Sequence, residues 1–235
     1  FNVAPNGQIQ LLPDAIRAQA QAAGLQLPPI MAIAGPVKAS ECASAKPTAT
    51  VFACRDYELA KRYAKTVTPP NYSVTPSQDE IGVEVCAALK NIYAIALGIA
   101  DGMSAADEQP RDNLRAAIFV QAVTEMASLC HALGGDLQTA YGLAGMGDLQ
   151  LTSTAGRSRL YGHAVGAGQN PRQALEQMQS QGLTIEGSPA ALIAHQLVQQ
   201  LGLNAPLLEA VYQMLHGHVD DARALICAVA LGADA

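Results

Sequence analysis

Hydrophobic and polar positions change their spacing about a third of the way along the chain. Short apolar or β-branched runs come first, and they predict buried strands at 30–34, 48–54 and 71–75. Segments with helical spacing separate and precede these runs, at 11–23 and 56–67. Strands alternating with helices indicate βαβ units and a parallel sheet.

The strand pattern ends at residue 77, and the rest of the chain has helical spacing. Residues 79–103 predict a long helix whose middle, 92–100, is apolar on every face, as in the central helix of a bundle. Capping residues, early prolines and closing glycines predict later helices that begin near 112, 170, 188, 206 and 220. We therefore predict an α/β part over residues 1–78 and an all-helical domain over 79–235.

Composition narrows the classes of function. Half of the 235 residues are apolar and 14% are charged, which excludes a disordered chain and a disulfide scaffold. The net charge of −6 gives no bulk attraction for nucleic acid or an anionic membrane, so neither is expected as a partner.

The cysteines and the absence of obvious targeting signals suggest a compartment. Five scattered cysteines without a CxxC spacing are expected to be buried thiols of a cytoplasmic protein. The uncharged stretch 91–100 is shorter than the ~20 apolar residues of a membrane span. The first residues show no signal-peptide pattern.

Two features can carry chemistry or be purely structural. Lys90, the last of five lysines, lies in an apolar helical stretch. It either extends to the surface at the helix edge or, if burial lowers its pKa, transfers a proton. The glycine-rich segment 142–147, followed by Asp148, is either a tight connection between helices or a loop at a site.

A third candidate is the cationic segment after Gly156, where Arg157 and Arg159 flank Ser158. It is either a solvated helix start or a phosphate site, because guanidinium binds phosphate in a bidentate manner. A hydrolase with Ser158 as nucleophile is a distant alternative, since the G-x-S-x-G pattern is incomplete. His195 is expected at the surface. His216 and His218 lack a third ligand, so no metal site is expected.

Together these motifs closely resemble NAD(P)-dependent glycerol-3-phosphate dehydrogenase, in order over nearly the whole chain. Five matches with the right order and spacing are a specific signal. They are Gly35-Pro36 with Glu41 and Pro47-Thr48-Ala49; Ile81-Gly82-Val83-Glu84 with Ala88-Leu89-Lys90-Asn91; Asn113 with Arg115; Gly142-Leu-Ala-Gly145-Met-Gly147-Asp148-Leu149 with Leu151-Thr152; and Glu186-Gly187.

The resemblance implies a fold and an activity. Residues 1–78 would be the rear half of a Rossmann-type parallel sheet, part of a dinucleotide-binding domain, and 79–235 the substrate-binding domain. The reaction would interconvert sn-glycerol 3-phosphate and dihydroxyacetone phosphate by hydride transfer with NAD or NADP, supplying a glycerophospholipid precursor.

The resemblance also implies roles for single residues. Lys90 would be the general acid or base, Asp148 would hold it or the substrate hydroxyls, and Arg159 would bind the phosphate. The other implied contacts are with substrate, from Asn91, Thr152 and Ser158, and with cofactor, from Gly35, Glu41 and Glu186.

Two departures from the family keep alternatives open. The family pattern Ser-Arg-Asn-Arg-Arg-Phe-Gly corresponds here to 158–162, two residues shorter and without the Asn, so a reductase of another small hydroxy compound is an alternative. The family's G-x-G-x-x-G loop is expected before residue 1, and without it we expect poor NAD(P) binding and an open sheet edge. A non-catalytic fragment that binds ligand or self-associates is the competing interpretation, and a homodimer is plausible.

Overall fold

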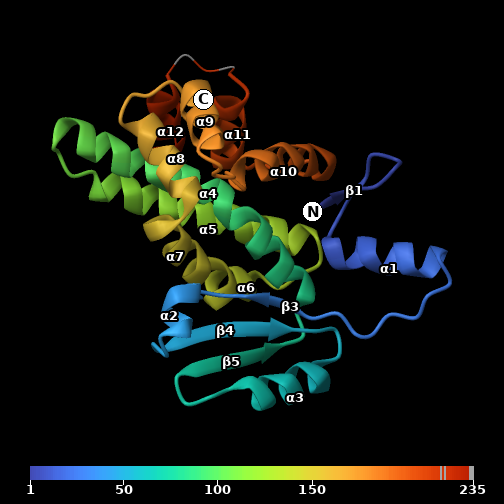
Figure 1. Ribbon diagram of the computed structural model, residues 1–235. Helices are drawn as coiled ribbons and strands as arrows, with labels where there is room; N and C mark the ends of the chain where they lie inside the picture. The colour runs from blue at the N-terminus through green and yellow to red at the C-terminus, as the bar shows by residue number, and fades with distance from the viewer. Residues whose placement is uncertain (218, 220, 233–235) are drawn as a thin grey trace. The chain divides into compact units, whose positions relative to one another are not determined.

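The structure, a computed structural model, describes residues 1–217, 219 and 221–232 (Figure 1). The chain forms two compact units, one of residues 1–88 and 126–148, the other of residues 89–125 and 149–235. Two long helices, α4 (Glu80–Asp107) and α5 (Asp112–Ala132), each contribute to both units. This division differs from the expected division after residue 78, which stays a prediction.

The first unit contains a three-stranded sheet in the order β3-β4-β5, with β3 (Ala32–Ala34), β4 (Thr48–Ala53) and β5 (Tyr72–Ser77). Strands β4 and β5 are parallel, whereas β3 is antiparallel to β4. The prediction of an all-parallel sheet is therefore wrong for β3. The connection from β3 to β4 holds the short helix α2 (Ala39–Ala43), and it returns the chain to pair with β3 in the opposite direction.

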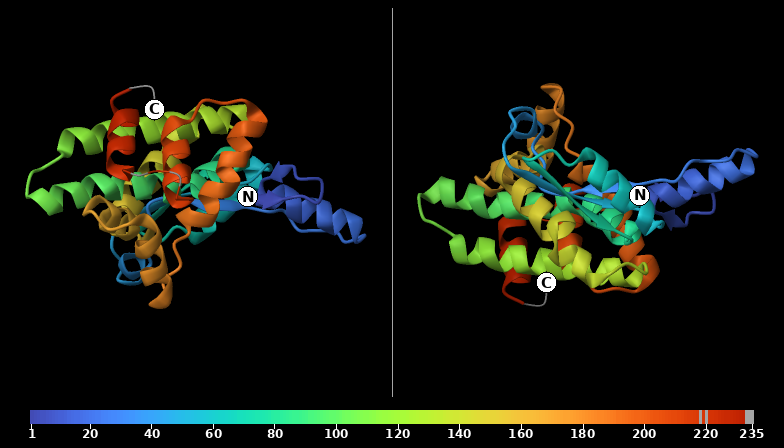
Figure 2. Two further views of the ribbon diagram at one scale, coloured as in Figure 1. Left: turned by 90° about the horizontal axis from the view of Figure 1, so that it is seen from above. Right: turned by 90° about the horizontal axis from the view of Figure 1, so that it is seen from below.

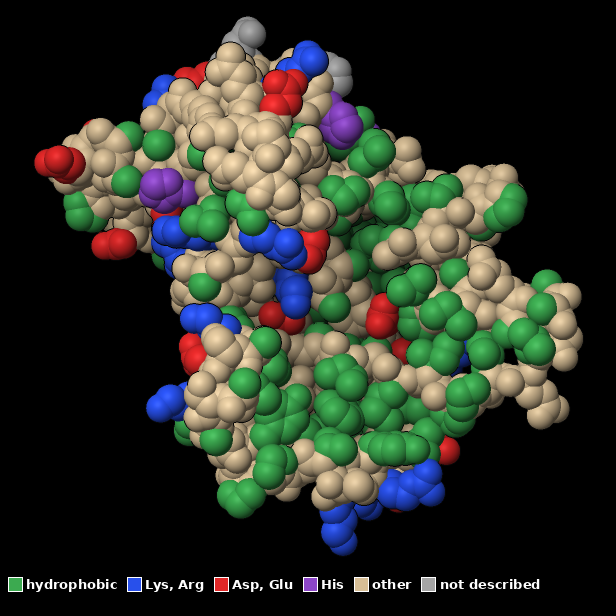
Figure 3. All heavy atoms as spheres, viewed as in Figure 1, with side chains coloured by type: hydrophobic (Ala, Val, Ile, Leu, Met, Phe, Trp, Pro, Cys, Tyr) green, Lys and Arg blue, Asp and Glu red, His purple; other side chains and the backbone are tan. Residues whose placement is uncertain are grey.

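Helix α3 (Tyr57–Val67) packs on β4 and β5. The side chain of Asp56 accepts a hydrogen bond from the Leu59 N–H at 3.1 Å, so the predicted N-cap is confirmed. The outer side of α3 is basic, and Figure 3 shows the blue side chains gathered over it at the lower edge of the molecule. The exposed cations of this helix are Lys61, Arg62 and Lys65.

The chain begins with a hairpin, β1 (Asn2–Val3) and β2 (Ile9–Gln10), followed by α1 (Leu12–Ala22). Glu80, at the start of α4, is 3% exposed and accepts hydrogen bonds from two nitrogens of Arg17 at 2.6 and 2.7 Å. A buried carboxylate is costly unless it is paired. This ion pair therefore fastens α1 to the first turn of α4.

Two further elements of the first unit are α6 (Leu137–Tyr141) and the π-helical turn η1 (Leu143–Gly147).

The cysteines are free thiols. Those buried are Cys54, Cys86 and Cys130, while Cys42 and Cys227 are half-buried. The expectation of burial is therefore confirmed for three of the five.

In the second unit, α4 and α5 lie side by side in both views of Figure 2. By length and composition alone, α4 is long and apolar enough to cross a membrane. Its uncharged stretch 91–100, the only part considered from the sequence, is too short for a membrane span. Within the most apolar window of α4, 72% of the residues are buried inside the protein. Such burial is typical of the central helix of a bundle, which is the role predicted for it.

Helix α8 (Arg157–Gly166) packs against α4 through glycines on both helices. A Cβ at Gly102 would lie 2.0 Å from the carbonyl oxygen of His163, and one at Gly162 would lie 2.0 Å from that of Ile95. No side chain fits at these distances, so the two backbones are in direct contact. This contact fixes the position of α8 on α4.

The remaining helices of the second unit follow the predicted caps. Asn170 caps α9 through the N–H groups of residues 172 and 173, with Pro171 as first residue. The starts predicted near 170, 188 and 206 are confirmed, whereas Asp220 lies outside the described residues and Asp221 caps the last helix. These elements are α7 (Asp148–Ala155), α9 (Pro171–Ser180), α10 (Gly187–Leu201), α11 (Pro206–Leu215) and α12 (Ala222–Ala230).

Candidate functional site

A pocket of about 210 Å³ in the second unit gathers most of the predicted substrate-binding residues. Its lining comes from α4, α7, the start of α8 and the segment before α10. The residues are Lys90, Asn91, Thr152, Gly156, Arg157, Ser158, Thr184 and Glu186. The structure thus brings together five residues that the sequence singled out separately: Lys90, Asn91, Thr152, Ser158 and Glu186.

Lys90 and Asn91 of helix α4 line this pocket because the other faces of the helix are buried in the core. Leu89 and Ile92, on either side of the pair, are fully buried, whereas Lys90 and Asn91 are half-buried. Buried neighbours fix the rotation of the helix about its axis. An amine and an amide are therefore held at one edge of an otherwise apolar helix.

Glu186 connects two of the elements that line the pocket. Its Oε1 lies 2.6 Å from Nη2 of Arg157, and its Oε2 accepts a hydrogen bond from Nδ2 of Asn91 at 3.0 Å. Nearby, the Oγ of Ser158 accepts a hydrogen bond from the Gly187 N–H at 3.3 Å. The pocket therefore already binds one carboxylate, contributed by the chain itself.

The start of α8 favours an anion at this position. Gly156 is the N-cap and has no side chain that could cap the first N–H groups of the helix. Uncapped N–H groups and the positive end of the helix dipole attract anions. Arg157 adds a full positive charge at the same place, and the combination is typical of a phosphate site.

Arg159, the residue predicted to bind phosphate, is not among the described residues that line this pocket. Its Nε donates to Oδ2 of Asp101 at 2.9 Å, and Arg115 donates to Oδ1 of the same carboxylate at 3.0 Å. Arg115 also donates to the hydroxyl of Ser153 at 3.0 Å. Asp101 thus pairs with both guanidinium groups, whose two positive charges exceed its single negative charge, and a phosphate-binding role for Arg159 stays a prediction.

Arg157 belongs to the cationic segment that the sequence offered as a candidate phosphate site, but the resemblance assigned phosphate binding to Arg159 instead. The pattern Ser-Arg-Asn-Arg-Arg-Phe-Gly has seven residues, as does the segment 156–162 that ends at Gly162. Counted back from this glycine without a gap, the first Arg of the pattern falls on Arg157 and the Asn falls on Ser158. The signal was therefore present in the sequence, and equating the pattern with residues 158–162 concealed it.

Asp148 and Gly35 belong to the first unit, where the structure brings them together. The Gly35 N–H donates to Oδ2 of Asp148 at 3.3 Å, and Asp148 is 3% exposed. The glycine-rich segment before Asp148 is the turn η1 rather than a loop, and a Cβ at Gly145 would lie 2.2 Å from the carbonyl oxygen of Ala140. The glycine there serves close packing, and the expected partnership of Asp148 with Lys90 stays a prediction.

Glu41, predicted to contact the cofactor, lies on α2 in the first unit. Its side chain is exposed, and its carboxylate is 3.6 Å from Nζ of Lys38, one turn earlier. Surface pairs of this kind contribute little to stability. The cofactor role of Glu41 stays a prediction.

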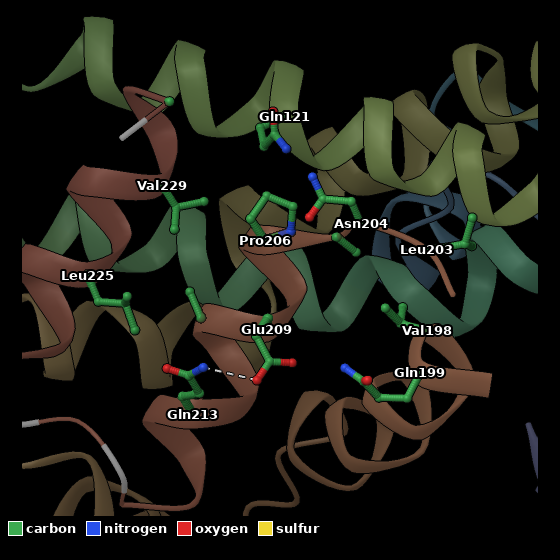
Figure 4. A pocket seen from close by; sticks show the side chains of 13 residues that line it. Gln121, Val198, Gln199, Leu203, Asn204, Pro206, Glu209, Gln213, Leu225 and Val229 are labelled. Carbon is green, nitrogen blue, oxygen red and sulfur yellow. Dashed lines mark hydrogen bonds between the residues drawn. The ribbon is translucent and has the colours of Figure 1, made fainter. Parts of the chain in front are cut away.

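A larger pocket, about 510 Å³, lies among α5, α10, α11 and α12 (Figure 4). Amides dominate its polar lining, from Gln121, Gln199, Asn204 and Gln213, together with the carboxylate of Glu209. No Lys or Arg is among the described residues that line it. A pocket with a carboxylate and no cation is unsuited to a phosphate, so the smaller pocket is the better candidate despite its size.

His195, expected at the surface, is half-buried. Its ring stacks on that of Tyr212 with centroids 3.8 Å apart, and its Nδ1 lies 2.6 Å from Oε2 of Glu209. The side chain is 20% exposed. The stacking partner comes from the next helix, which sequence spacing on α10 could not indicate.

A metal centre finds no support in the part of the chain that the structure describes. No group of three or more His, Cys, Asp and Glu side chains there is placed to hold an ion. His216 packs against Tyr212 with ring centroids 4.5 Å apart. His218, considered with it in the sequence, lies outside the described residues.

Comparison with known proteins adds to this geometry. A profile described as NAD-dependent glycerol-3-phosphate dehydrogenase C-terminus matches residues 79–225, more than half of the chain. The chain belongs to this family. It is 40% identical over 189 residues to glycerol-3-phosphate dehydrogenase (NAD(P)+) of Symbiobacterium thermophilum, covering 80% of this chain and 53% of that protein. Its identity to the Geobacter metallireducens protein of the same name is 38% over 210 residues, covering 86% and 60%.

Solved structures support the same conclusion. The crystal structure of glycerol-3-phosphate dehydrogenase from Coxiella burnetii matches with a TM-score of 0.78 at 34% identity, covering 90% of this chain and 63% of that one. The fold class is thus confirmed as a short sheet with parallel strands followed by a helical part, with β3 as the exception noted above. The chain spans between half and two thirds of the length of these relatives.

The described residues do not form a complete site for a dinucleotide. The pyrophosphate needs a glycine-rich turn whose free N–H groups face it, and the sequence contains no G-x-G-x-x-G. The N–H of Gly35, the glycine that follows β3, already donates to Asp148. The cofactor contacts predicted for Gly35, Glu41 and Glu186 stay predictions.

Proposed function

We propose that this chain provides the substrate site of a glycerol-3-phosphate dehydrogenase. The observation that carries the proposal is that Lys90 and Arg157 line one pocket of about 210 Å³. This volume is below that of pockets for drug-sized ligands and suits a three-carbon phosphate ester. The compound would be sn-glycerol 3-phosphate or dihydroxyacetone phosphate.

Each end of such a compound has a partner in the pocket. The phosphate binds Arg157 and the first N–H groups of α8, with the Asn91 amide as an additional donor. At the other end, the Lys90 ammonium donates a hydrogen bond to the carbonyl oxygen and transfers its proton to that oxygen as the ketone is reduced. In the oxidative direction the neutral amine removes the hydroxyl proton. Thr152 offers a hydroxyl for the remaining polar group.

The structure offers little to the alternative of a serine hydrolase. Ser158 is 2% exposed, and no histidine is among the described residues that line its pocket. A nucleophilic serine needs a base within hydrogen-bonding distance. The proposed hydride carrier is NAD or NADP, and the proposed role is to supply a precursor of glycerophospholipids. The proposed compartment is a reducing cytoplasm, which the free cysteines support.

Calorimetric titration of the 235-residue chain tests the substrate assignment. We expect sn-glycerol 3-phosphate and dihydroxyacetone phosphate to bind, and glycerol, which lacks the phosphate, to bind at least tenfold more weakly. Arg157→Gln should reduce the affinity for the phosphate esters towards that for glycerol. Equal affinity for glycerol and its phosphate ester would contradict the proposal.

A turnover assay separates the enzyme from the competing interpretation of a non-catalytic fragment. Oxidation of NADH with dihydroxyacetone phosphate by the purified chain would rule out that interpretation. If turnover is present, Lys90→Ala should reduce it by several orders of magnitude while circular dichroism shows an unchanged fold. Wild-type turnover in this variant would contradict the role of Lys90.

A further inference from the structure

In the candidate pocket, the carboxylate of Glu186 contacts the groups that a phosphate would need. One oxygen is 2.6 Å from Arg157 and the other accepts from Asn91 at 3.0 Å. Carboxylates and phosphates accept hydrogen bonds in similar geometry, especially from guanidinium. Glu186 therefore holds Arg157 and Asn91 in an arrangement that already fits an anion.

The carboxylate and a phosphate compete for the same donors. The pocket is small, about 210 Å³, and two anions beside one guanidinium repel each other more strongly as water is excluded. The contact with Glu186 uses Nη2 of Arg157, one of the nitrogens with which a guanidinium binds phosphate in a bidentate manner. A phosphate that takes the N–H groups now used by Glu186 displaces its side chain.

The backbone around Glu186 allows such a movement of the side chain alone. Glu186 precedes α10 as its N-cap residue, but its side chain makes no capping hydrogen bond. Its side chain is 55% exposed, while the preceding Ile185 is 3% exposed and anchors the backbone. Rotation of the side chain into solvent therefore leaves the helix start and the core contacts intact.

We infer that Glu186 is an internal competitor of the substrate phosphate, which occupies Arg157 and Asn91 until an anionic ligand displaces it. The inference rests on the function proposed for this pocket. As a consequence, the apparent affinity of the chain for phosphate is lower than the intrinsic affinity of the open pocket. The apparent affinity equals the intrinsic affinity multiplied by the fraction of molecules in which Glu186 has left the site. Removing the negative charge should therefore strengthen binding, which loss of a purely structural residue would not do.

The test measures the affinity of the chain for inorganic phosphate by calorimetry, in the parent and in Glu186→Gln. We expect Glu186→Gln to bind phosphate about three- to tenfold more tightly, since exposed ion pairs are weak and the Asn91 contact adds to this one. Glu176→Gln is the matched control, because it removes another exposed glutamate, paired with Arg172 at 3.0 Å outside the pocket. This control should bind phosphate like the parent.

The outcomes separate this inference from the function on which it rests. Equal or weaker phosphate binding by Glu186→Gln, with binding lost in Arg157→Gln, would overturn the competitor role and leave the phosphate site in place. Absence of phosphate binding in the parent and in Glu186→Gln would overturn both. Equal tightening in Glu176→Gln would show a general effect of net charge and also overturn the competitor role.

Discussion

The backbone N–H of Gly35 donates a hydrogen bond of 3.3 Å to Oδ2 of Asp148, linking residues 113 positions apart. The contact joins the end of β3 to the first residue of α7. Gly35 has a φ of +150°, and a Cβ there would lie 2.9 Å from Cα of Thr50. A glycine at this turn therefore allows the backbone to approach both the sheet and the carboxylate.

Replacing Asp148 tests how far this contact stabilises the first unit. Asp148→Ala removes the acceptor of a buried N–H, which should lower the free energy of unfolding by about 1–3 kcal/mol. Asp148→Asn keeps an oxygen that can accept and should cost less. Urea unfolding of both variants provides the measurement, and an equal loss in the two would show that the hydrogen bond is not the cause.

The glycines between α4 and α8 lead to a second prediction about stability. Gly162→Ala places a methyl group 2.0 Å from the carbonyl oxygen of Ile95. The helices must separate to relieve this overlap, and we expect a loss of about 1–3 kcal/mol, as for other overpacked cores. Thermal unfolding followed by circular dichroism measures it.

Gly142→Ala is the control for that substitution. Its φ of −94° is open to alanine, and an added Cβ would be 3.4 Å from the nearest atom, the carbonyl oxygen of Gln138. Unfolding of this variant should therefore stay close to that of the parent. If Gly142→Ala lost as much stability as Gly162→Ala, the close contact of the two backbones would not explain the effect.

The parts of the fold that could be predicted from sequence depend on short-range chemistry. The N-caps Asp56 and Asn170 bond to N–H groups two or three residues away, so their helix starts were visible in the sequence. The apolar run in the middle of α4 likewise predicted that this part of the helix is buried. Local propensity and tertiary structure agree at these positions.

The parts that could not be predicted depend on contacts far apart in the sequence. The direction of β3 is set by how a 13-residue connection turns, between Ala34 and Thr48. The glycine spacing of residues 142–147 indicates a loop as well as a helical turn, so it did not predict the π-helical turn η1. Arg157 and Arg159 lie near the same helix start and look equivalent in the sequence. In the structure they differ in their ion-pair partners, which are Glu186 for Arg157 and Asp101 for Arg159.

The two arginines of α8 should therefore respond differently to the same substitution. Arg157→Gln removes the cation of the candidate pocket and should weaken phosphate binding at least tenfold, with little loss of stability, because its pair with Glu186 is exposed. Arg159→Gln should leave phosphate affinity within about twofold and lower stability, because its partner Asp101 is 18% exposed.

Calorimetric titration with inorganic phosphate and urea unfolding, applied to both variants, distinguish the two roles. The reverse result would be loss of phosphate binding in Arg159→Gln and retention in Arg157→Gln. It would restore the assignment first suggested by the family pattern and contradict the one proposed for Arg157.

The last prediction concerns Glu125, a buried carboxylate of α5. It is 2% exposed and accepts hydrogen bonds from the N–H groups of Leu207 and Leu208, at 2.7 and 3.0 Å, at the start of α11. Burial raises the pKa of Glu125 above its ordinary value of 4.5, although these bonds and those from Gln121 and Tyr93 act to lower it. The folded protein therefore holds this proton at a pH where the unfolded chain has released it.

The sign of the resulting pH dependence follows from proton linkage. Between the ordinary pKa of 4.5 and the raised pKa, the folded state binds more protons than the unfolded state. The contribution of Glu125 to stability is therefore greatest at low pH, declines as the pH rises through this window, and is constant above it. Glu125→Gln does not titrate, so the parent's stability relative to this variant should decline with pH in the same way.

Urea unfolding of the parent and of Glu125→Gln at a series of values from about pH 4 to pH 8 measures this difference. The variant is expected to be less stable throughout, because a glutamine has one accepting oxygen for the two N–H groups of α11. That loss is independent of pH and does not hide the trend. A difference that stays flat would mean that Glu125 keeps its ordinary pKa in the folded protein. A difference that grows with rising pH would mean that its hydrogen bonds outweigh the effect of burial and lower its pKa.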